Sequence, residues 1–286
     1  MAVKPNSWDA RYFQMAFQLL LLSYGILFLQ WKAEWMAYSL YIGTGLVLQW
    51  LADIIIYKKI IHPFQWTSGS WKSVLISCFS LCLLLKTNQW YICILAAALT
   101  VLSKYIFTYL GKHIFNPSAF GIVATVLFTK EAWLSPAQWG SGIVLFFSVC
   151  CLGFIVVTKV QKLDITMAFL ISYAGLLFTR QIIYLNWPID VFVQSVSTGS
   201  LLLFSFFMIS DPKTAPNHKV ARIIWAVLIA SVAFYFSAFK WMNSTPIYVL
   251  VFAAPLVPLL NWLLKAKQFV WNQNQIALST EKIQKI

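Results

Sequence analysis

Residues 12–31 read YFQMAFQLLLLSYGILFLQW and contain no charged side chain. A helix of roughly 20 apolar residues spans the hydrocarbon core of a bilayer. Lys4 and Arg11 precede the stretch, which is too long for the apolar region of an ordinary cleavable signal peptide. We therefore predict that residues 12–31 form the first transmembrane helix of the protein.

The composition of the chain extends this prediction to the whole protein. Of the 286 residues, 60% are apolar and 10% are charged, and the mean hydropathy is +0.76. These values exclude a soluble domain and predict an all-α integral membrane protein. Ten apolar runs, each expected to be a transmembrane helix, cover residues 12–31, 36–57, 72–86, 90–109, 118–134, 141–158, 165–183, 190–209, 220–239 and 245–264. Run 72–86 is the weakest, because it offers fewer than the roughly 20 apolar positions of a full span.

The Lys and Arg residues are distributed unevenly between the connections. Sixteen of the 21 fall at the two termini and in the even-numbered connections, and five fall in the odd-numbered ones. Because positively charged connections stay in the cytoplasm, we expect both termini there, with residues 266–286 as a cytoplasmic tail. The net charge of +13 then reflects topology and contact with anionic lipids of the bilayer, and it gives no support for nucleic-acid binding.

Residues 1–265 are expected to form a single transmembrane domain. Ten helices allow two inverted repeats of five, at residues 12–134 and 141–264. Asn116-Pro117-Ser118 opens the fifth helix, and Asn243-Ser244-Thr245-Pro246 opens the tenth at the equivalent position. Proline in the first turn of a helix is also ordinary capping chemistry, so the sequence leaves a repeat and a coincidence both open.

Several chemistries find no support in the residues. His62, His113 and His218 all fall in connections, so no pair of histidines within the membrane is expected to hold a haem. The five cysteines include no CxxC pair, and the chain has no GxxxxGK[ST] phosphate loop. We therefore expect no metal site and no hydrolytic or nucleotide-driven reaction, and the sequence names no catalytic residue.

Two polar segments stand between the apolar runs, at residues 111–121 (GKHIFNPSAFG) and 206–216 (FFMISDPKTAP). In a membrane protein such segments are costly and mark functional sites. A helix that begins at Asn116-Pro117, close to Lys112 and His113, could bind a phosphate or another anion. Helix capping beside lipid-facing basic residues is the alternative.

Two charged residues outside that helix start are also informative. Asp211 precedes Pro212 and could hold a ligand, or it could pair locally with Lys213. Lys104 lies well inside an apolar run, where a lysine must pair, reach toward the membrane surface or serve a ligand. Both residues are therefore candidates for a binding site.

Together with Ser197-Thr198-Gly199-Ser200, the two polar segments resemble motifs of the NqrB/RnfD family. These ten-helix proteins are membrane subunits of the sodium-pumping NADH:quinone oxidoreductase and of the Rnf electron-transport complex. The resemblance covers about residues 40–265 in helix count, orientation and order of motifs. The chain is also similar to shorter, stand-alone members of the family, the UnbU proteins found beside enediyne biosynthesis genes.

The resemblance implies a flavin-associated electron-transfer subunit, which would belong to an oxidoreductase complex rather than act as a self-sufficient enzyme. Its cofactor would be FMN or riboflavin, and its partners would be other membrane redox subunits and a quinone, in the inner membrane of a bacterium. In the family, FMN is attached to a threonine of a Ser-Gly-Ala-Thr motif. This chain lacks that motif, so Thr158 and Thr198 are the threonines to inspect.

The isoalloxazine ring of a flavin needs a flat, mostly apolar slot with a few polar groups. The aromatic residues near the polar segments could line it, or could be ordinary core: Phe107, Tyr109, Phe115, Phe120, Phe206 and Phe207. The positive charge of nearby basic residues would favour a reduced, anionic flavin. The full set of residues expected to bind the cofactor is Lys104, Lys112, His113, Asn116, Pro117, Ser118, Phe120, Thr198, Asp211, Lys213 and Thr214.

Two functions of other classes stay open at this point. One is a permease of the same fold without flavin, whose inverted repeat encloses a pathway for a small molecule or an ion. The other is a membrane scaffold for a biosynthetic complex. Asp53 and Asp190 are the acidic residues near helix ends that could serve a cation pathway, although Asp53 could instead pair with Lys58 or Lys59.

Overall fold

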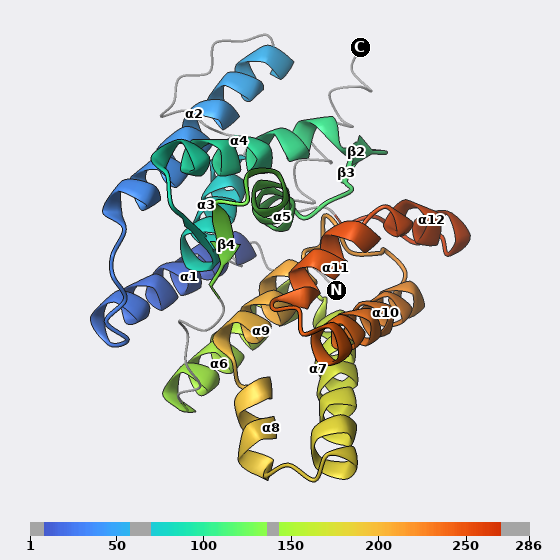
Figure 1. Cartoon of the computed structure of the whole chain (residues 1–286). Helices are drawn as coiled ribbons and strands as arrows, with labels where there is room; N and C mark the ends of the chain where they lie inside the picture. Colours follow the sequence, from blue (N-terminus) through green and yellow to red (C-terminus); the bar gives the residue numbers. More distant parts are fainter. Residues whose placement is uncertain (1–8, 58–69, 136–142, 270–286) are drawn as a thin grey trace.

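The computed structural model describes residues 9–57, 70–135 and 143–269, and these ranges are mostly helical (Figure 1). The first half of the chain forms α1 (Ala10–Leu27), α2 (Trp35–Tyr57), α3 (Ser70–Leu84), α4 (Trp90–Ile106) and α5 (Pro117–Thr129). The second half forms α6 (Ile143–Lys159), α7 (Leu163–Phe178), η3 (Thr179–Tyr184), α8 (Ile189–Val196), α9 (Gly199–Leu203), η4 (Phe204–Met208), α10 (Lys219–Lys240), α11 (Thr245–Ala253) and α12 (Leu256–Leu263), where η denotes a π-helical segment. The predicted all-α architecture is confirmed for these ranges.

Two pairs of short antiparallel strands follow the ends of helices. β1 (Leu85–Thr87) pairs with β4 (Ala132–Leu134), and β2 (Thr108–Tyr109) pairs with β3 (Lys112–His113). The helices that we predicted up to residues 86, 109 and 134 were therefore too long at their C-terminal ends. At these positions the backbone hydrogen-bonds to a neighbouring strand instead of continuing the helix.

The helices of each half of the chain pack mainly against one another. In the first half α4 contacts α2 and α5, and α3 contacts α1 and α2. In the second half α10 contacts α7 and α11. The two groups, which are neighbours in Figure 1, meet where α5 touches α11 and where α1 touches α6. This division falls between the predicted repeats at 12–134 and 141–264, and their inverted symmetry stays a prediction.

Ion pairs join connections that the distribution of Lys and Arg assigned to the same side. The pairs are Asp9–Lys72 at 3.4 Å, Asp164–Arg222 at 2.6 Å and, at the opposite ends of the helices, Glu34–Lys86 at 3.3 Å. These ion pairs show which helix ends lie close together, but they do not show which of them face the cytoplasm. The cytoplasmic location of both termini stays a prediction, and most of the predicted tail lies outside the described residues.

Two helices that we predicted as continuous, at 190–209 and 245–264, are broken. The axes of α8 and of the α9–η4 segment differ by 44°, with the break at Ser197-Thr198. The axes of α11 and α12 differ by 58°, and Pro255 immediately precedes α12. Proline removes a backbone donor and crowds the preceding turn, which explains the second break. At the first break, the Ser-Thr pair is followed by glycine, which is a weak helix former.

Length limits how many of these helices could cross a membrane. By length and composition, Trp35–Ile55, Leu163–Tyr184 and Lys219–Lys240 could each do so alone. Each bent pair could form one more span, which gives three to five candidate spans in the described ranges. Ten spans are therefore not confirmed, because α3, α4 and α5 have only 15, 17 and 13 residues, whereas a bilayer core requires roughly 20.

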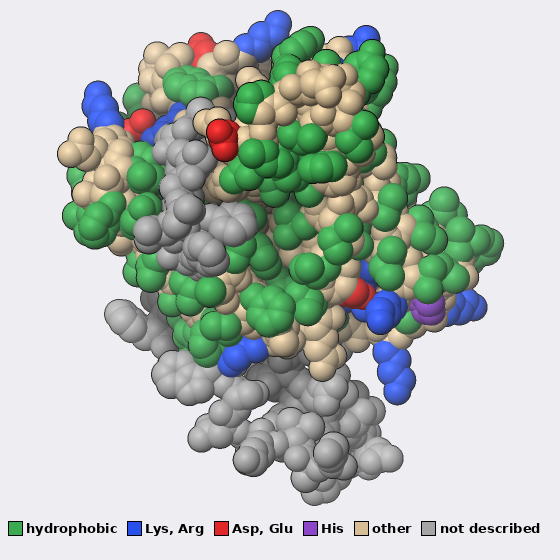
Figure 2. All heavy atoms as spheres, turned by 90° about the horizontal axis from the view of Figure 1, so that it is seen from below, with side chains coloured by type: hydrophobic (Ala, Val, Ile, Leu, Met, Phe, Trp, Pro, Cys, Tyr) green, Lys and Arg blue, Asp and Glu red, His purple; other side chains and the backbone are tan. Residues whose placement is uncertain are grey.

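The surface of the protein is apolar, whereas several fully buried side chains are polar. Hydrophobic side chains cover the middle of the face shown in Figure 2, and most Lys and Arg side chains lie toward its margins. Phe128 and Ile55 are 80% and 74% exposed, whereas Gln18 and Thr166 are completely buried. Lipid accepts such an apolar surface and water does not. The protein is therefore embedded in a membrane.

The contact between α4 and α5 depends on a glycine. A Cβ atom built on Gly121 would lie 1.8 Å from Thr100 Oγ1 and 3.1 Å from the backbone oxygen of Ala96. We predict that Gly121→Ala lowers the free energy of unfolding by about 1–3 kcal/mol, because the two helices must separate. The melting temperature of the detergent-solubilised protein measures this change.

Gly175 is the matched control for this substitution. It also lies within a helix, but a Cβ atom there would meet nothing within 4 Å. Gly175→Ala should leave stability unchanged or raise it by up to ~1 kcal/mol through the helix propensity of alanine. Equal losses in both variants would show that helix propensity, not the close approach of α4 and α5, decides the result.

Candidate functional site

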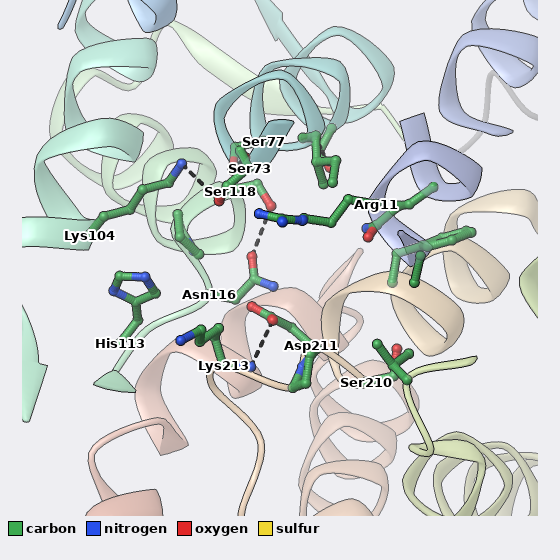
Figure 3. A pocket seen from close by; sticks show the side chains of 18 of the residues that line it. Arg11, Ser73, Ser77, Lys104, His113, Asn116, Ser118, Ser210, Asp211 and Lys213 are labelled. Carbon is green, nitrogen blue, oxygen red and sulfur yellow. Dashed lines mark hydrogen bonds between the residues drawn. The ribbon is translucent and has the colours of Figure 1, made fainter. Parts of the chain in front are cut away.

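A cavity of about 300 Å³ lies where the two polar segments of the sequence come together (Figure 3). We call it the first cavity. It is walled by α1, α2, α3, α4, the start of α5, the end of α6, η4 and the turn that follows η4. Seven of the predicted site residues line it: Lys104, His113, Asn116, Pro117, Ser118, Asp211 and Lys213. Segments that are about a hundred residues apart in the chain thus share one site.

Asn116 joins the two polar segments directly. Its side-chain oxygen accepts hydrogen bonds from the Ala119 amide at 3.2 Å and the Ser118 hydroxyl at 2.8 Å, which caps the first turn of α5. Its side-chain nitrogen donates to the backbone oxygen of Met208, at the end of η4, at 3.2 Å. Asn116 is 7% exposed, so both roles are performed in the interior. The capping alternative is correct for this residue, and the cavity lies beside the cap.

Asp211 organises the turn that follows η4. Its carboxylate accepts a hydrogen bond from the Lys213 amide at 3.0 Å, and its backbone oxygen accepts one from the Ala215 amide at 2.9 Å. The buried Thr214 hydroxyl lies 3.5 Å from the same backbone oxygen. The structure therefore shows Asp211 hydrogen-bonded within its own turn. Its side chain also lines the first cavity.

The charge of the first cavity is predominantly positive. Arg11, Lys104 and Lys213 line it, and Asp211 is the one carboxylate that the described part of the chain places in its lining. Lys104 is 5% exposed and donates to the Ser73 hydroxyl at 3.4 Å. Figure 3 shows the side chains of Arg11, Lys104 and Asn116 pointing toward the same space. A site of this charge favours an anionic or electron-rich ligand.

The aromatic residues that we expected near the site divide into two groups. Phe206 and Phe207 line the first cavity, and Phe207 stacks on Phe17 with ring centroids 4.9 Å apart. Phe107, Phe115 and Phe120 instead pack on one another, with centroids 5.0–5.2 Å apart. This second group supports the start of α5 and does not line the cavity.

Two further predicted residues lie elsewhere. Lys112 lies in the wall of a second cavity, and its ammonium donates to Asn217 Oδ1 at 2.8 Å and to the backbone oxygen of Ala215. Thr198 lies in a third cavity, at the break between α8 and α9, beside the start of α11. The structure therefore does not bring these two residues together with the first cavity.

Sequence reasoning missed the part of the first cavity that α1, α2 and α3 supply. Ser73, Ser77 and Ser80 line one side of it. Spacings of four and three residues place them on one face of α3, and this signal was present in the sequence. Gln49 of α2 also lines the cavity and donates to Asp53 Oδ1 at 3.1 Å.

Tyr105 also hydrogen-bonds to the buried carboxylate of Asp53. Its hydroxyl donates to Asp53 Oδ1 at 3.1 Å, and the carboxylate is 3% exposed. The amide of Gln49 also donates to the Tyr105 hydroxyl. Asp53 is therefore held by side chains of α2 and α4 within the protein.

An apolar outer surface and an internal polar cavity define an integral membrane protein with a cavity between its helices. Residues 135–270, a little under half of the chain, match the model of the NQR2, RnfD, RnfE family. This match agrees with the resemblance to the NqrB/RnfD family that the motifs carry. The matched region contains the segment 206–216 but not the segment 111–121. No curated protein matches the chain significantly.

The family match indicates a coarse functional class, that of membrane subunits of electron-transport or ion-translocating complexes. Membrane partners accord with that class.

Asn116 allows the cap of α5 and the bridge to η4 to be separated by mutation. We predict that Asn116→Ala lowers the free energy of unfolding by about 2–4 kcal/mol, because it removes the cap and leaves the Met208 oxygen without this partner. Asn116→Ser keeps a capping oxygen but cannot reach Met208, and should lose about half as much. Melting temperatures of the two variants test this order, and equal losses would show that the bridge contributes nothing.

Proposed function

We propose that this protein is a flavin-associated electron-transfer subunit and that the first cavity holds FMN or riboflavin. The observation that carries the proposal is the meeting of both family-like segments, 111–121 and 206–216, in the wall of one cavity. A flavin supplies one- and two-electron redox chemistry when it is bound. The residues of this chain would bind it, orient it and set the charge around it.

The lining of the first cavity suits the ring of a flavin. Phe206 and Phe207 offer apolar surface, and Ser77 and Ser118 offer hydroxyl groups. Gln49 Oε1 is buried and has no hydrogen-bond partner within the described residues. A buried acceptor without a partner costs about 1–3 kcal/mol, and an N–H group of a ligand in the cavity would remove that cost.

The cationic residues of the first cavity suit a redox role. A reduced flavin can carry a negative charge, and a cation inside a low-dielectric site stabilises it. Lys104 is almost fully buried and donates to a neutral hydroxyl, that of Ser73. We therefore assign Lys104 the largest influence on the flavin.

Attachment through a threonine finds no support at the first cavity. Thr158 and Thr198 do not line it: the Thr158 hydroxyl donates to the Phe154 backbone oxygen at 2.7 Å, and Thr198 lies in the third cavity. We propose non-covalent binding. Electrons would pass between partner redox subunits and a quinone, in the inner membrane of a bacterium.

A permease without flavin is the second candidate. The observation that favours it is the third cavity, of about 270 Å³, which lies where the break before α9 meets the start of α11. Transporters often build substrate sites from interrupted helices of this kind. Uptake of a small solute or an ion into proteoliposomes distinguishes this function from electron transfer.

The test of the flavin proposal is the visible spectrum of the protein purified from cells supplied with riboflavin. We predict flavin absorbance that denaturation releases into solution. Lys104→Gln should weaken flavin binding about ten-fold, because a charge-assisted hydrogen bond contributes about 1.5–3 kcal/mol. Gln49→Leu should also weaken flavin binding, because it removes a buried hydrogen-bond acceptor.

Lys240→Gln is the matched control, because this lysine is exposed at the end of α10 and does not line the first cavity. Its flavin content should equal that of the unchanged protein. A colourless protein would sink the proposal. Flavin absorbance with equal flavin content in all variants would show that the protein binds flavin, but outside the first cavity.

A further inference from the structure

A second cavity, of about 320 Å³, lies between the β2–β3 hairpin and α12. Lys112, Asn217, Asn261, Lys265 and Gln268 contribute polar groups, and among the described residues neither Asp nor Glu lines it. Its wall shares His113 with the first cavity. The flavin proposal uses none of the residues that line this cavity alone.

Lys112 gives the second cavity a buried positive charge. The side chain is 8% exposed, and its ammonium donates to two neutral oxygens, those of Ala215 and Asn217. Burial, followed by repulsion from Lys162, lowers the pKa of Lys112 to about 8. A charge that the protein itself destabilises in this way is stabilised by an anion placed beside it.

Hydrogen-bond donors surround that charge. Asn261 Oδ1 accepts a hydrogen bond from the backbone N–H of Asn217 at 2.8 Å. The side-chain N–H groups of Asn261 therefore stay available as donors. His113 Nδ1 is buried and makes no hydrogen bond within the described ranges. The Lys112 ammonium and the Asn261 amide together offer donors to the oxygens of a phosphate group.

The rim of the second cavity is apolar and exposed. Leu110 at the tip of the hairpin is 81% exposed, and Trp262 on α12 is 70% exposed. Leu263, next to Trp262, is 59% exposed. A free phosphate ion would gain nothing from this rim, whereas acyl chains would cover it, and aromatic side chains such as Trp262 favour the membrane interface.

We propose that the second cavity binds the phosphate head group of an anionic phospholipid, with Lys112 and Asn261 contacting the phosphate and α12 contacting the acyl chains. The cavity differs from the proposed flavin site apart from the shared His113, and the proposal does not rest on the presence of flavin. It explains why a lysine is kept buried beside neutral oxygens at this end of the protein.

Native mass spectrometry of the full chain in detergent tests the proposal. Phosphatidylglycerol and phosphatidylcholine are added in equal amounts, and we expect adducts of phosphatidylglycerol to dominate. Lys112→Gln should weaken this binding about ten-fold, which corresponds to about 1.4 kcal/mol. Lys112→Arg keeps the charge and should bind within about three-fold of the unchanged protein.

Two further variants keep the test decisive if Lys112→Gln does not fold. Lys265→Gln and Asn261→Leu change residues that line the second cavity but not the first, and each should weaken phosphatidylglycerol binding several-fold. Lys240→Gln, on α10, should not change it. Adducts that persist equally in all variants would overturn the proposal.

Inorganic phosphate distinguishes the two sources of the anion. Because the acyl chains contribute to binding, we expect 10-fold molar excesses of phosphate over lipid to leave the phosphatidylglycerol adducts intact. Displacement of the lipid by phosphate would identify a site for a free anion and overturn the lipid assignment. Flavin content, measured on the same samples, reports separately on the first cavity.

Discussion

The contact between the start of α5 and the end of η4 depends on one side chain that hydrogen-bonds to backbone groups of both elements. In an apolar environment every N–H and C=O group that leaves a helix must find a partner within the protein. Asn116 meets this requirement for the Ala119 amide and for the Met208 oxygen at once. The start of α5 and the end of η4 are thereby fixed at one point, and the first cavity forms beside that point.

The positions of the helices follow from the apolar runs, but their lengths do not. Each of the ten runs contains a helix, because burial in lipid or protein selects long apolar stretches. The early end of α3 depends on β4, a partner about 47 residues further along the chain, and no local pattern announces such a pairing. The bend at Pro255 was visible in the sequence, since proline interrupts helices.

The candidate site could be predicted where its residues belong to the polar segments, and not where they lie within apolar runs. Asn116 and Asp211 stood out because charge and proline surround them. Ser77 and Gln49 did not, because a single polar residue in a transmembrane run is as often a structural hydrogen bond as a ligand contact. Lys112 lines the second cavity and not the first, whereas its neighbour His113 lines both, and the sequence does not separate the two cavities.

His113 belongs to the walls of both the first and the second cavity. Burial lowers the pKa of its imidazole, and Asp211 acts in the opposite direction. A negative charge that enters either cavity would favour the protonated imidazole, and the added proton would then change the potential in the other cavity. Ligands in the two cavities would then be thermodynamically linked, and the linkage would be reciprocal. The composition of the lipid around such a protein would then act as an effector of whatever the first cavity holds.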